Sequence, residues 1–256
     1  MPAKVGHQEG TVYNPMLLNG TDAQLQKLLM TGVVIAGKVA RIQQEKLDEF
    51  MLQMRNHLVA HRDPAANHPP FAQLLSILSL MSGEWKLKQL LLNVKLGKYN
   101  LLMQSFPYMA RQPLDLRACT REDLCKIPGV GMKTASFFIL FTRPGIRMCC
   151  LDTHILQYMA EHKLADNIPR QPRNEKDYLR LEQAFLKYCD EKHPNESVAD
   201  VDFNIWLARN VGDKQKSKEP DPNTCHMCGG PADNGEGWDG LCGNCADREA
   251  RRKGEV

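Results

Sequence analysis

Apolar residues recur three or four positions apart along most of the chain, which is the spacing of a helix that buries one face. The first such run starts where Thr21 and Gln24 have the spacing of a capping box, and it continues to about Asn56. Gly32 or Gly37 can divide this run into two helices. Alternating apolar and polar residues, the pattern of a half-buried strand, are nearly missing. We therefore expect an almost entirely α-helical fold.

Helical spacing continues beyond this first run. We expect further helices over residues 71–81, 84–95, 98–110, 120–127, 132–142, 152–163 and 174–190. Residues 61–70 hold three prolines and are predicted to form a loop. Residues 211–222 are polar and contain proline, which is typical of a linker, and they precede a glycine-rich segment with paired cysteines.

Composition narrows the class of protein. The 256 residues are 43% apolar, enough for a sizeable core, and the net charge of +3 is only weak support for a polyanionic partner. No run of about 18 apolar residues is present to span a membrane, and no N-terminal apolar run resembles a signal peptide. The nine cysteines lack the regular spacing of a disulfide framework. We expect a monomer in a reducing intracellular compartment, the cytoplasm or nucleoid, or the nucleus in a eukaryote.

The segment Leu124-Cys-Lys-Ile-Pro-Gly-Val-Gly-Met-Lys-Thr-Ala135 predicts a helix-hairpin-helix over residues 120–142. Thr120 and Asp123 can cap the first helix, Pro128 can end it, and two glycines give the turn conformational freedom and let another backbone approach. The amides of the hairpin and of the next helix N-terminus can hold a DNA phosphate without reading sequence. The residues expected at this contact are Gly129, Val130, Gly131 and Thr134.

Lys133 lies at the start of the second hairpin helix, and Asp152 lies further along the chain, before another predicted helix. In a hairpin that only binds DNA, such a lysine contacts phosphate, and an aspartate before a helix can be its N-cap. Together the two residues can perform covalent chemistry, because a neutral amine can attack a sugar carbon and a carboxylate can accept its proton. The electropositive helix N-terminus favours the neutral amine.

Three stretches resemble the helix-hairpin-helix glycosylases of the endonuclease III and 8-oxoguanine glycosylase kind, over about residues 64–210. They are Ile127-Pro-Gly-Val-Gly-Met-Lys-Thr-Ala135, Leu151-Asp-Thr-His154 and Asn67-His-Pro-Pro-Phe-Ala-Gln-Leu-Leu-Ser-Ile-Leu-Ser79. The resemblance implies an all-α, two-lobed fold. Residues 1–63 are expected to pack with residues 145–210 as one helical lobe, and residues 64–144 are expected to form a barrel lobe that contains the hairpin.

The family pairs a lysine and an aspartate in these motifs, which implies that Lys133 and Asp152 are the catalytic pair. The implied activity is that of a bifunctional DNA glycosylase and AP lyase. Such an enzyme flips a base out of double-stranded DNA, releases it through a lysine Schiff base and cuts the strand by β-elimination. The segment Asp202-Phe-Asn-Ile-Trp206 resembles the C-terminal end of compact archaeal-type 8-oxoguanine glycosylases and favours an oxidised purine such as 8-oxoguanine. Two alternatives stay open: a glycosylase for a deliberately modified base of phage or host, and a non-catalytic DNA-binding protein.

The chain departs from these relatives at two places. Endonuclease III-like members carry four cysteines of an iron–sulfur cluster after the catalytic region, whereas Cys189 stands alone between Asp152 and Arg209, so no such cluster is expected. Where many relatives have a glutamine that fills the gap left by the flipped base, this chain has Met81, which is either a DNA-binding wedge or a core methionine. His154 either orients a substrate group on the DNA or is a structural histidine.

Other side chains near these motifs also have more than one interpretation. Cys149 and Cys150 are expected to be small hydrophobes that face the core. Four basic side chains either line the DNA-binding face or are solvated charges: Arg121, Lys126, Arg143 and Arg147.

Residues 223–256 contain two Cys-x-x-Cys pairs, Cys225-His-Met-Cys228 and Cys242-Gly-Asn-Cys245, with thirteen residues between them. Four thiolates at this spacing can close the tetrahedral shell of one zinc ion and leave it no open position. We expect a structural Zn²⁺ that supplies folding energy to a segment too short to bury a core. A redox-active or disulfide-bonded pair is the alternative.

Overall fold

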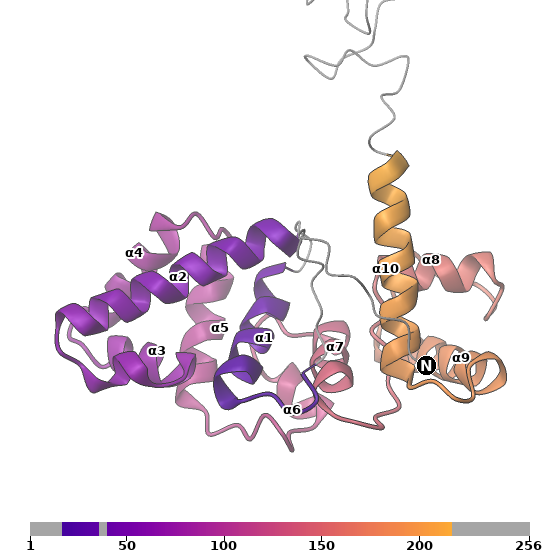
Figure 1. Cartoon of the computed structure of the whole chain (residues 1–256), viewed down its shortest axis with the longest axis horizontal. Helices are drawn as coiled ribbons and strands as arrows, with labels where there is room; N and C mark the ends of the chain where they lie inside the picture. Colours follow the sequence, from indigo (N-terminus) through magenta and orange to yellow (C-terminus); the bar gives the residue numbers. More distant parts are fainter. Residues whose placement is uncertain (1–16, 36–39, 217–256) are drawn as a thin grey trace, which may run out of the picture. The chain divides into compact units, whose positions relative to one another are not determined.

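The computed structural model describes residues 17–35 and 40–216, with side chains described for residues 17–35 and 41–209. Within these ranges every regular element is a helix, which confirms the predicted fold class. The elements, shown in Figure 1, are α1 (Asp22–Ile35), α2 (Ala40–Ala60), the 3₁₀ helix η1 (Pro64–Asn67), α3 (Pro70–Leu78), α4 (Gly83–Asn93), α5 (Tyr99–Arg111), α6 (Arg121–Cys125), α7 (Met132–Thr142), α8 (Thr153–Glu161), α9 (Glu175–Lys192) and α10 (Val198–Lys216).

A capping box begins the first helix, as the sequence predicts. The Gln24 N–H donates to Thr21 Oγ1 at 3.4 Å, and Gln24 Oε1 accepts the Thr21 N–H at 2.8 Å. The first helical run divides between α1 and α2, so Gly32 lies inside α1 and not at the break. A Cβ on Gly32 would lie 2.9 Å from Thr134 Cγ2 of α7. Glycine at this position therefore permits α1 and α7 to pack closely.

Helix α10 is an element that the sequence pattern did not predict. The Asp200 N–H donates to Ser197 Oγ at 3.1 Å, and Ser197 Oγ donates to Asp200 Oδ2 at 2.6 Å. Ser197-Val-Ala-Asp200 is thus a capping motif, a local signal from which the helix start can be predicted. The helix continues to Lys216, so residues 211–216 of the predicted linker are helical.

Helix α1 lies inside the molecule. Every residue from Leu28 to Val34 is buried, and a helix that is buried on all sides needs neighbours on several sides. Helices α2, α3, α5 and α7 are those neighbours (Figure 1). One apolar core runs through α1 to α7, from Leu25 to Ile139.

This packing bears on one part of the predicted division into lobes, the place of α1 and α2. Helices α1 and α2 share their core with the helices of residues 64–144, whereas they were expected to pack with residues 145–210. The cause is the burial of α1, which requires the neighbours that α3, α5 and α7 supply. The chain divides into two compact units, and the boundary between them lies between Asn204 and Ile205, inside α10.

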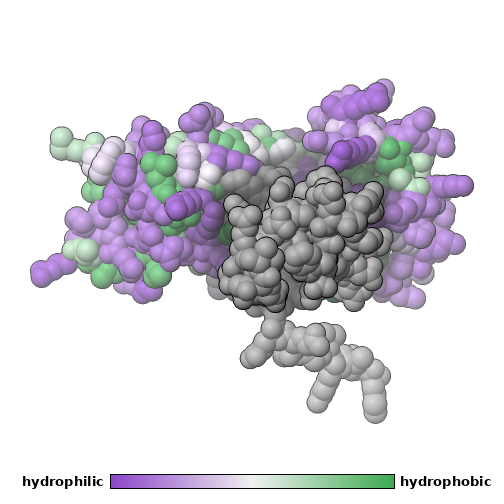
Figure 2. Space-filling model, turned by 90° about the horizontal axis from the view of Figure 1, so that it is seen from above, coloured by the Kyte–Doolittle hydropathy of each residue, from purple (hydrophilic) through white to green (hydrophobic). Residues whose placement is uncertain are grey.

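The coloured surface in Figure 2 is mostly hydrophilic, and apolar side chains lie scattered among polar ones. Isolated exposed apolar side chains are normal for a folded protein. In the part of the chain that the structure describes, none of the helices combines the length and the apolar character needed to cross a membrane.

Candidate active site

The helix-hairpin-helix is formed by α6, a short turn and α7. Thr120 caps α6 by accepting the Asp123 N–H, and the Asp123 carboxylate accepts the Thr120 N–H, so the predicted capping box is present. In the turn, the Val130 N–H donates to the carbonyl of Ile127 at 3.0 Å. Gly129 has a φ of +82°, in the left-handed region that favours glycine. These contacts confirm the predicted hairpin.

Gly131 plays a different part from Gly129. Its φ of −102° is open to any residue, so it does not need a glycine for conformation. A Cβ on Gly131 would meet no atom within 4 Å, and within the described residues no side chain caps α7. The N–H groups of the first turn of α7 are therefore open to an anion.

Two of the predicted DNA contacts are limited to the main chain. The side chains of Val130 and Thr134 are buried, the first in the apolar core and the second beside Gly32. The N–H of Val130 is already used inside the turn. Gly129 and Gly131 are the exposed residues of this loop.

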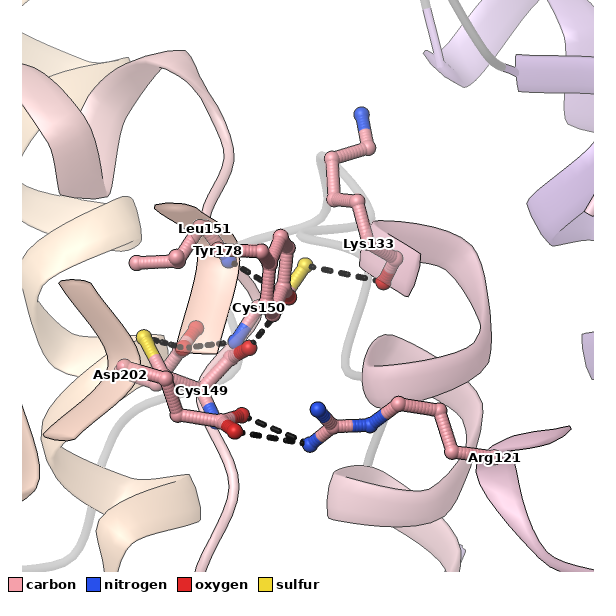
Figure 3. A network of polar contacts seen from close by, with 8 residues as sticks. Arg121, Lys133, Cys149, Cys150, Leu151, Tyr178 and Asp202 are labelled. Carbon is pink, nitrogen blue, oxygen red and sulfur yellow. Dashed lines mark hydrogen bonds and ion pairs between the residues drawn. The ribbon is translucent and has the colours of Figure 1, made fainter. Parts of the chain in front are cut away.

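Lys133 and Asp152 are both connected to one buried residue, Cys150, which contacts the Lys133 main chain and precedes Asp152 by two positions. Lys133 is the second residue of α7 and is exposed, and the Cys150 thiol donates to its carbonyl at 3.8 Å. Burial raises the pKa of Cys150 well above its usual value, the carboxylates of Asp202 and Asp152 raise it further, and the Lys133 ammonium lowers it. The charges of Asp152 and Lys133 thus have opposite effects on the pKa of Cys150. Figure 3 shows the Lys133 side chain extending away from the buried contacts.

Asp152 is the N-cap of α8. Its Oδ1 accepts the Ile155 N–H at 2.9 Å, and its side chain is half-buried. The cap fixes the carboxylate at the start of the helix, as the sequence predicts, and a capping role does not exclude catalysis. His154, in the first turn of the same helix, is half-buried.

The buried carboxyl group of Asp202 is a functional candidate that the sequence analysis did not single out. It accepts the Cys150 N–H at 3.0 Å and the Cys149 thiol at 3.6 Å. Burial raises the pKa of Asp202 to about 8, with the Asp152 charge adding to the effect and these two hydrogen bonds opposing it. A signal was available: Val198, Val201 and Asp202 are all buried at helical spacing, so a carboxyl group stands on an apolar face.

Met81 is fully exposed, between α3 and α4. Its interpretation as a core methionine is therefore wrong. Helix α3 ends at Leu78, before the side chain at position 81 can join the buried face. A flexible apolar side chain in solvent remains compatible with the wedge interpretation.

The predicted basic side chains have partners within the protein. Arg121 is buried and bonds to Glu182, so both predicted alternatives, a side chain on the DNA-binding face and a solvated charge, are wrong. Lys126 pairs with Asp123, Arg143 donates to the carbonyl of Cys119, and Arg147 pairs with Asp190. Lys126 and Arg147 remain largely exposed despite these pairs.

The cysteines that the sequence analysis assigned a role fall into two groups. Cys149 and Cys150 are buried, as predicted for small core residues, and they also make the polar contacts described above. The four predicted zinc ligands lie outside the described residues: Cys225, Cys228, Cys242 and Cys245.

An exposed lysine in the first turn of the second hairpin helix, followed by an aspartate that caps the next helix, is the arrangement expected of a helix-hairpin-helix DNA glycosylase. Residues 102–193, which include both side chains, match the family model described as 8-oxoguanine DNA glycosylase. Together with the helical architecture, this match confirms the predicted resemblance to the glycosylase superfamily and its fold.

Solved structures of this kind are similar to the chain. The 8-oxoguanine glycosylase/lyase of Methanocaldococcus jannaschii, in complex with a 15mer DNA containing 8-oxoguanine, has a TM-score of 0.52 at 19% identity, over 75% of this chain and 84% of that chain. Tm1821, the 8-oxoguanine DNA glycosylase of Thermotoga maritima, has a TM-score of 0.49 at 21% identity, over 74% of this chain and 81% of that chain. At 19% identity the likeness to the Methanocaldococcus structure shows the fold alone. No curated protein matches the chain.

Proposed function

We propose that this chain is a bifunctional DNA glycosylase and AP lyase that removes a damaged base, with 8-oxoguanine as the favoured substrate. The carrying observation is that the buried Cys150 links the two residues: its thiol donates to the carbonyl of Lys133 on α7, and it lies two positions before Asp152 at the start of α8. The 8-oxoguanine glycosylase family model spans both residues, and the similar Methanocaldococcus enzyme was solved on DNA containing 8-oxoguanine.

DNA binding is assigned to the hairpin and to the exposed side chain of Met81. The open N-terminus of α7 and the exposed Gly129 and Gly131 suit a backbone phosphate, which positions the duplex without reading its sequence. The base must leave the stack before chemistry, which costs about a few kcal/mol. Met81, an exposed apolar side chain, is the proposed wedge that fills the vacated space.

The chemistry requires one nucleophile and one proton acceptor. The unprotonated amine of Lys133 forms a bond to C1′ of the flipped nucleotide, the C1′–N9 bond breaks, and the base leaves with the bonding electrons and takes a proton from water. Asp152 accepts the proton that the attacking amine loses, and its charge stabilises positive charge on the sugar. Asp152 then returns this proton to O4′ as the ring opens, which leaves a protonated imine. Loss of a C2′ proton from the imine expels the 3′ phosphate and cuts the strand.

A structural zinc ion in residues 223–256 is a separate part of the proposed function. The two Cys-x-x-Cys pairs would supply a closed set of four ligands, so the metal would stabilise the fold and take no part in base excision.

The test is borohydride trapping on a duplex that contains 8-oxoguanine. Borohydride reduces the imine to a stable amine, so an active enzyme should become covalently joined to the DNA. The Lys133→Gln variant should give no adduct while binding an undamaged duplex with an affinity within about twofold of the unchanged protein, because the hairpin amides are retained. An undiminished adduct in that variant would remove Lys133 from the role of nucleophile.

A further inference from the structure

The segment before Asp152 has no helix or strand to pair its backbone, and buried side chains pair it instead. The Tyr178 hydroxyl donates to the carbonyl of Cys149 at 2.6 Å and accepts the Leu151 N–H at 3.3 Å. The Cys150 N–H donates to Asp202. Since a buried backbone group without a partner is costly, these contacts leave the segment little freedom to move (Figure 3).

A buried ion pair joins this segment to the hairpin. Glu182 of α9 accepts the Cys149 N–H at 2.9 Å through Oε1. Arg121 Nη2 donates to both oxygens of the same carboxylate, to Oε1 at 2.7 Å and to Oε2 at 3.0 Å. Arg121 is the first residue of α6, so the pair connects the first hairpin helix to the backbone three residues before Asp152.

The placement of this ion pair is not explained by its effect on stability. The side chains of Arg121 and Glu182 are only 7% and 4% exposed, and within the described residues Arg121 Nε has no hydrogen-bond partner. Taking two charges out of water costs as much as their attraction returns, and apolar replacements of buried pairs are commonly neutral or stabilising. Unlike apolar side chains, this pair can hold the segment in one position, because Glu182 bonds to the Cys149 N–H.

The two catalytic candidates depend on the two ends of this connection. Lys133 is on α7, which follows α6 through the short hairpin turn, and its carbonyl accepts the Cys150 thiol. Asp152 follows directly after the segment that Glu182 and Asp202 hold. A shift of the segment against the hairpin would change the distance between the amine and the carboxylate, and a displacement of about 1 Å can cost about a hundredfold in rate.

We propose that Arg121 and Glu182 are positioning residues that hold Asp152 in place against Lys133, an inference that rests on the function proposed for those two residues. They touch neither DNA nor the reacting atoms. Their effect is on the rate of the covalent step and not on DNA affinity.

The test uses a duplex with one abasic site, whose C1′ aldehyde reacts with Lys133 irrespective of which base the enzyme prefers. The amine forms a C=N bond at C1′, water leaves, and borohydride reduces the bond to an amine. The double variant Arg121→Met/Glu182→Gln removes both charges and leaves a glutamine oxygen to accept the Cys149 N–H. Because no single charge stays buried, we expect its thermal midpoint to lie within a few degrees of that of the unchanged protein. With enzyme in excess, the trapping rate should fall about tenfold or more while the dissociation constant for DNA changes by less than about twofold.

Two further variants separate positioning from stability. Arg147→Met/Asp190→Asn removes an exposed pair that also reaches α9 but does not bond to residues 149–151, and it should keep the trapping rate at saturation. The Arg121→Lys variant keeps a cation beside Glu182 and should retain at least about half of the trapping rate. This variant tests the positioning role even if the double variant does not fold.

The outcomes are distinct. If Lys133→Gln traps DNA like the unchanged protein, the proposed function fails. If Lys133→Gln abolishes trapping but the folded double variant reacts at the unchanged rate, the function stands and the positioning role is wrong. A matching loss in Arg147→Met/Asp190→Asn, or a full loss in Arg121→Lys without loss of the fold, would also overturn the positioning role.

Discussion

The carboxyl group of Asp202 accepts the main-chain N–H of Cys150 at 3.0 Å, and this contact lies two residues before the catalytic candidate Asp152. Asp202 is buried, and the groups that interact with it are the Asp152 carboxylate and the thiols of Cys149, Cys150 and Cys189. Because burial and the nearby Asp152 charge raise its pKa to about 8, Asp202 holds a proton at neutral pH.

The raised pKa of Asp202 predicts how stability depends on pH. Between its ordinary pKa of 3.8 and about 8, the folded protein binds this proton and the unfolded chain does not. The free energy of unfolding therefore decreases as the pH rises through this window, by up to about 1.4 kcal/mol per pH unit from this group. Asp202→Asn removes the titration, so the variant should gain stability over the unchanged protein steadily from about pH 5 to about pH 8. Urea unfolding at several pH values measures the difference.

The control for this pH effect is Asp166→Asn, which changes an exposed carboxylate in the same way. Its stability curve should run parallel to that of the unchanged protein. If the Asp202→Asn curve is also parallel, the Asp202 proton is not held in the folded state.

Asp152→Asn separates capping from catalysis. The asparagine oxygen can still accept the Ile155 N–H, so the fold should be unchanged, whereas the proton acceptor and the negative charge are lost. We expect the single-turnover rate of base excision to fall about a hundredfold or more. Asp63→Asn, at the N-cap of η1, is the matched control and should leave the rate within about twofold. Turnover by Asp152→Asn within that same range would make Asp152 a helix cap and nothing more.

Local signals account for most of what the sequence predicted correctly. The caps at Thr120 and Asp152 and the left-handed turn at Gly129 each depend on residues a few positions apart, so their chemistry can be read directly from the sequence. The pairing of Lys133 with Asp152 needed the family resemblance in addition, since no local rule joins the two. The missed start of α10 at Ser197 was also local.

Contacts between distant positions could not be predicted in this way. Cys149 and Glu182 are 33 positions apart, and Cys150 and Asp202 are 52 positions apart, so no periodic pattern relates them. Arg121 was misassigned for the same reason, because its buried partner is 61 positions away. For Met81 the sequence left a wedge and a core methionine open, and the side chain is exposed because the apolar helix before it ends at Leu78.

Zinc content tests the proposal for residues 223–256. A closed set of four thiolates should hold about one zinc ion per chain, and elemental analysis should find no stoichiometric iron. The Cys242→Ser/Cys245→Ser variant should lose the metal. The Cys125→Ser variant, which changes a half-buried cysteine of α6, should retain it. Stoichiometric iron with visible absorbance, or equal zinc in both variants, would contradict the assignment.

Met81→Ala tests whether an exposed apolar side chain stabilises the flipped state of the DNA. The side chain is fully exposed, so its removal should leave the thermal midpoint unchanged. If it fills the space left by the flipped base, its loss should make flipping less favourable by about 1.4 kcal/mol or more and lower the excision rate on a paired lesion about tenfold. A lesion in single-stranded DNA has no stack to refill, so excision there should fall much less. Leu52→Ala, a half-exposed leucine of α2, is the control and should affect neither substrate. Equal losses on paired and single-stranded lesions would show that Met81 contacts the substrate in another way, and no loss on either would show that it is a surface residue without a role in excision.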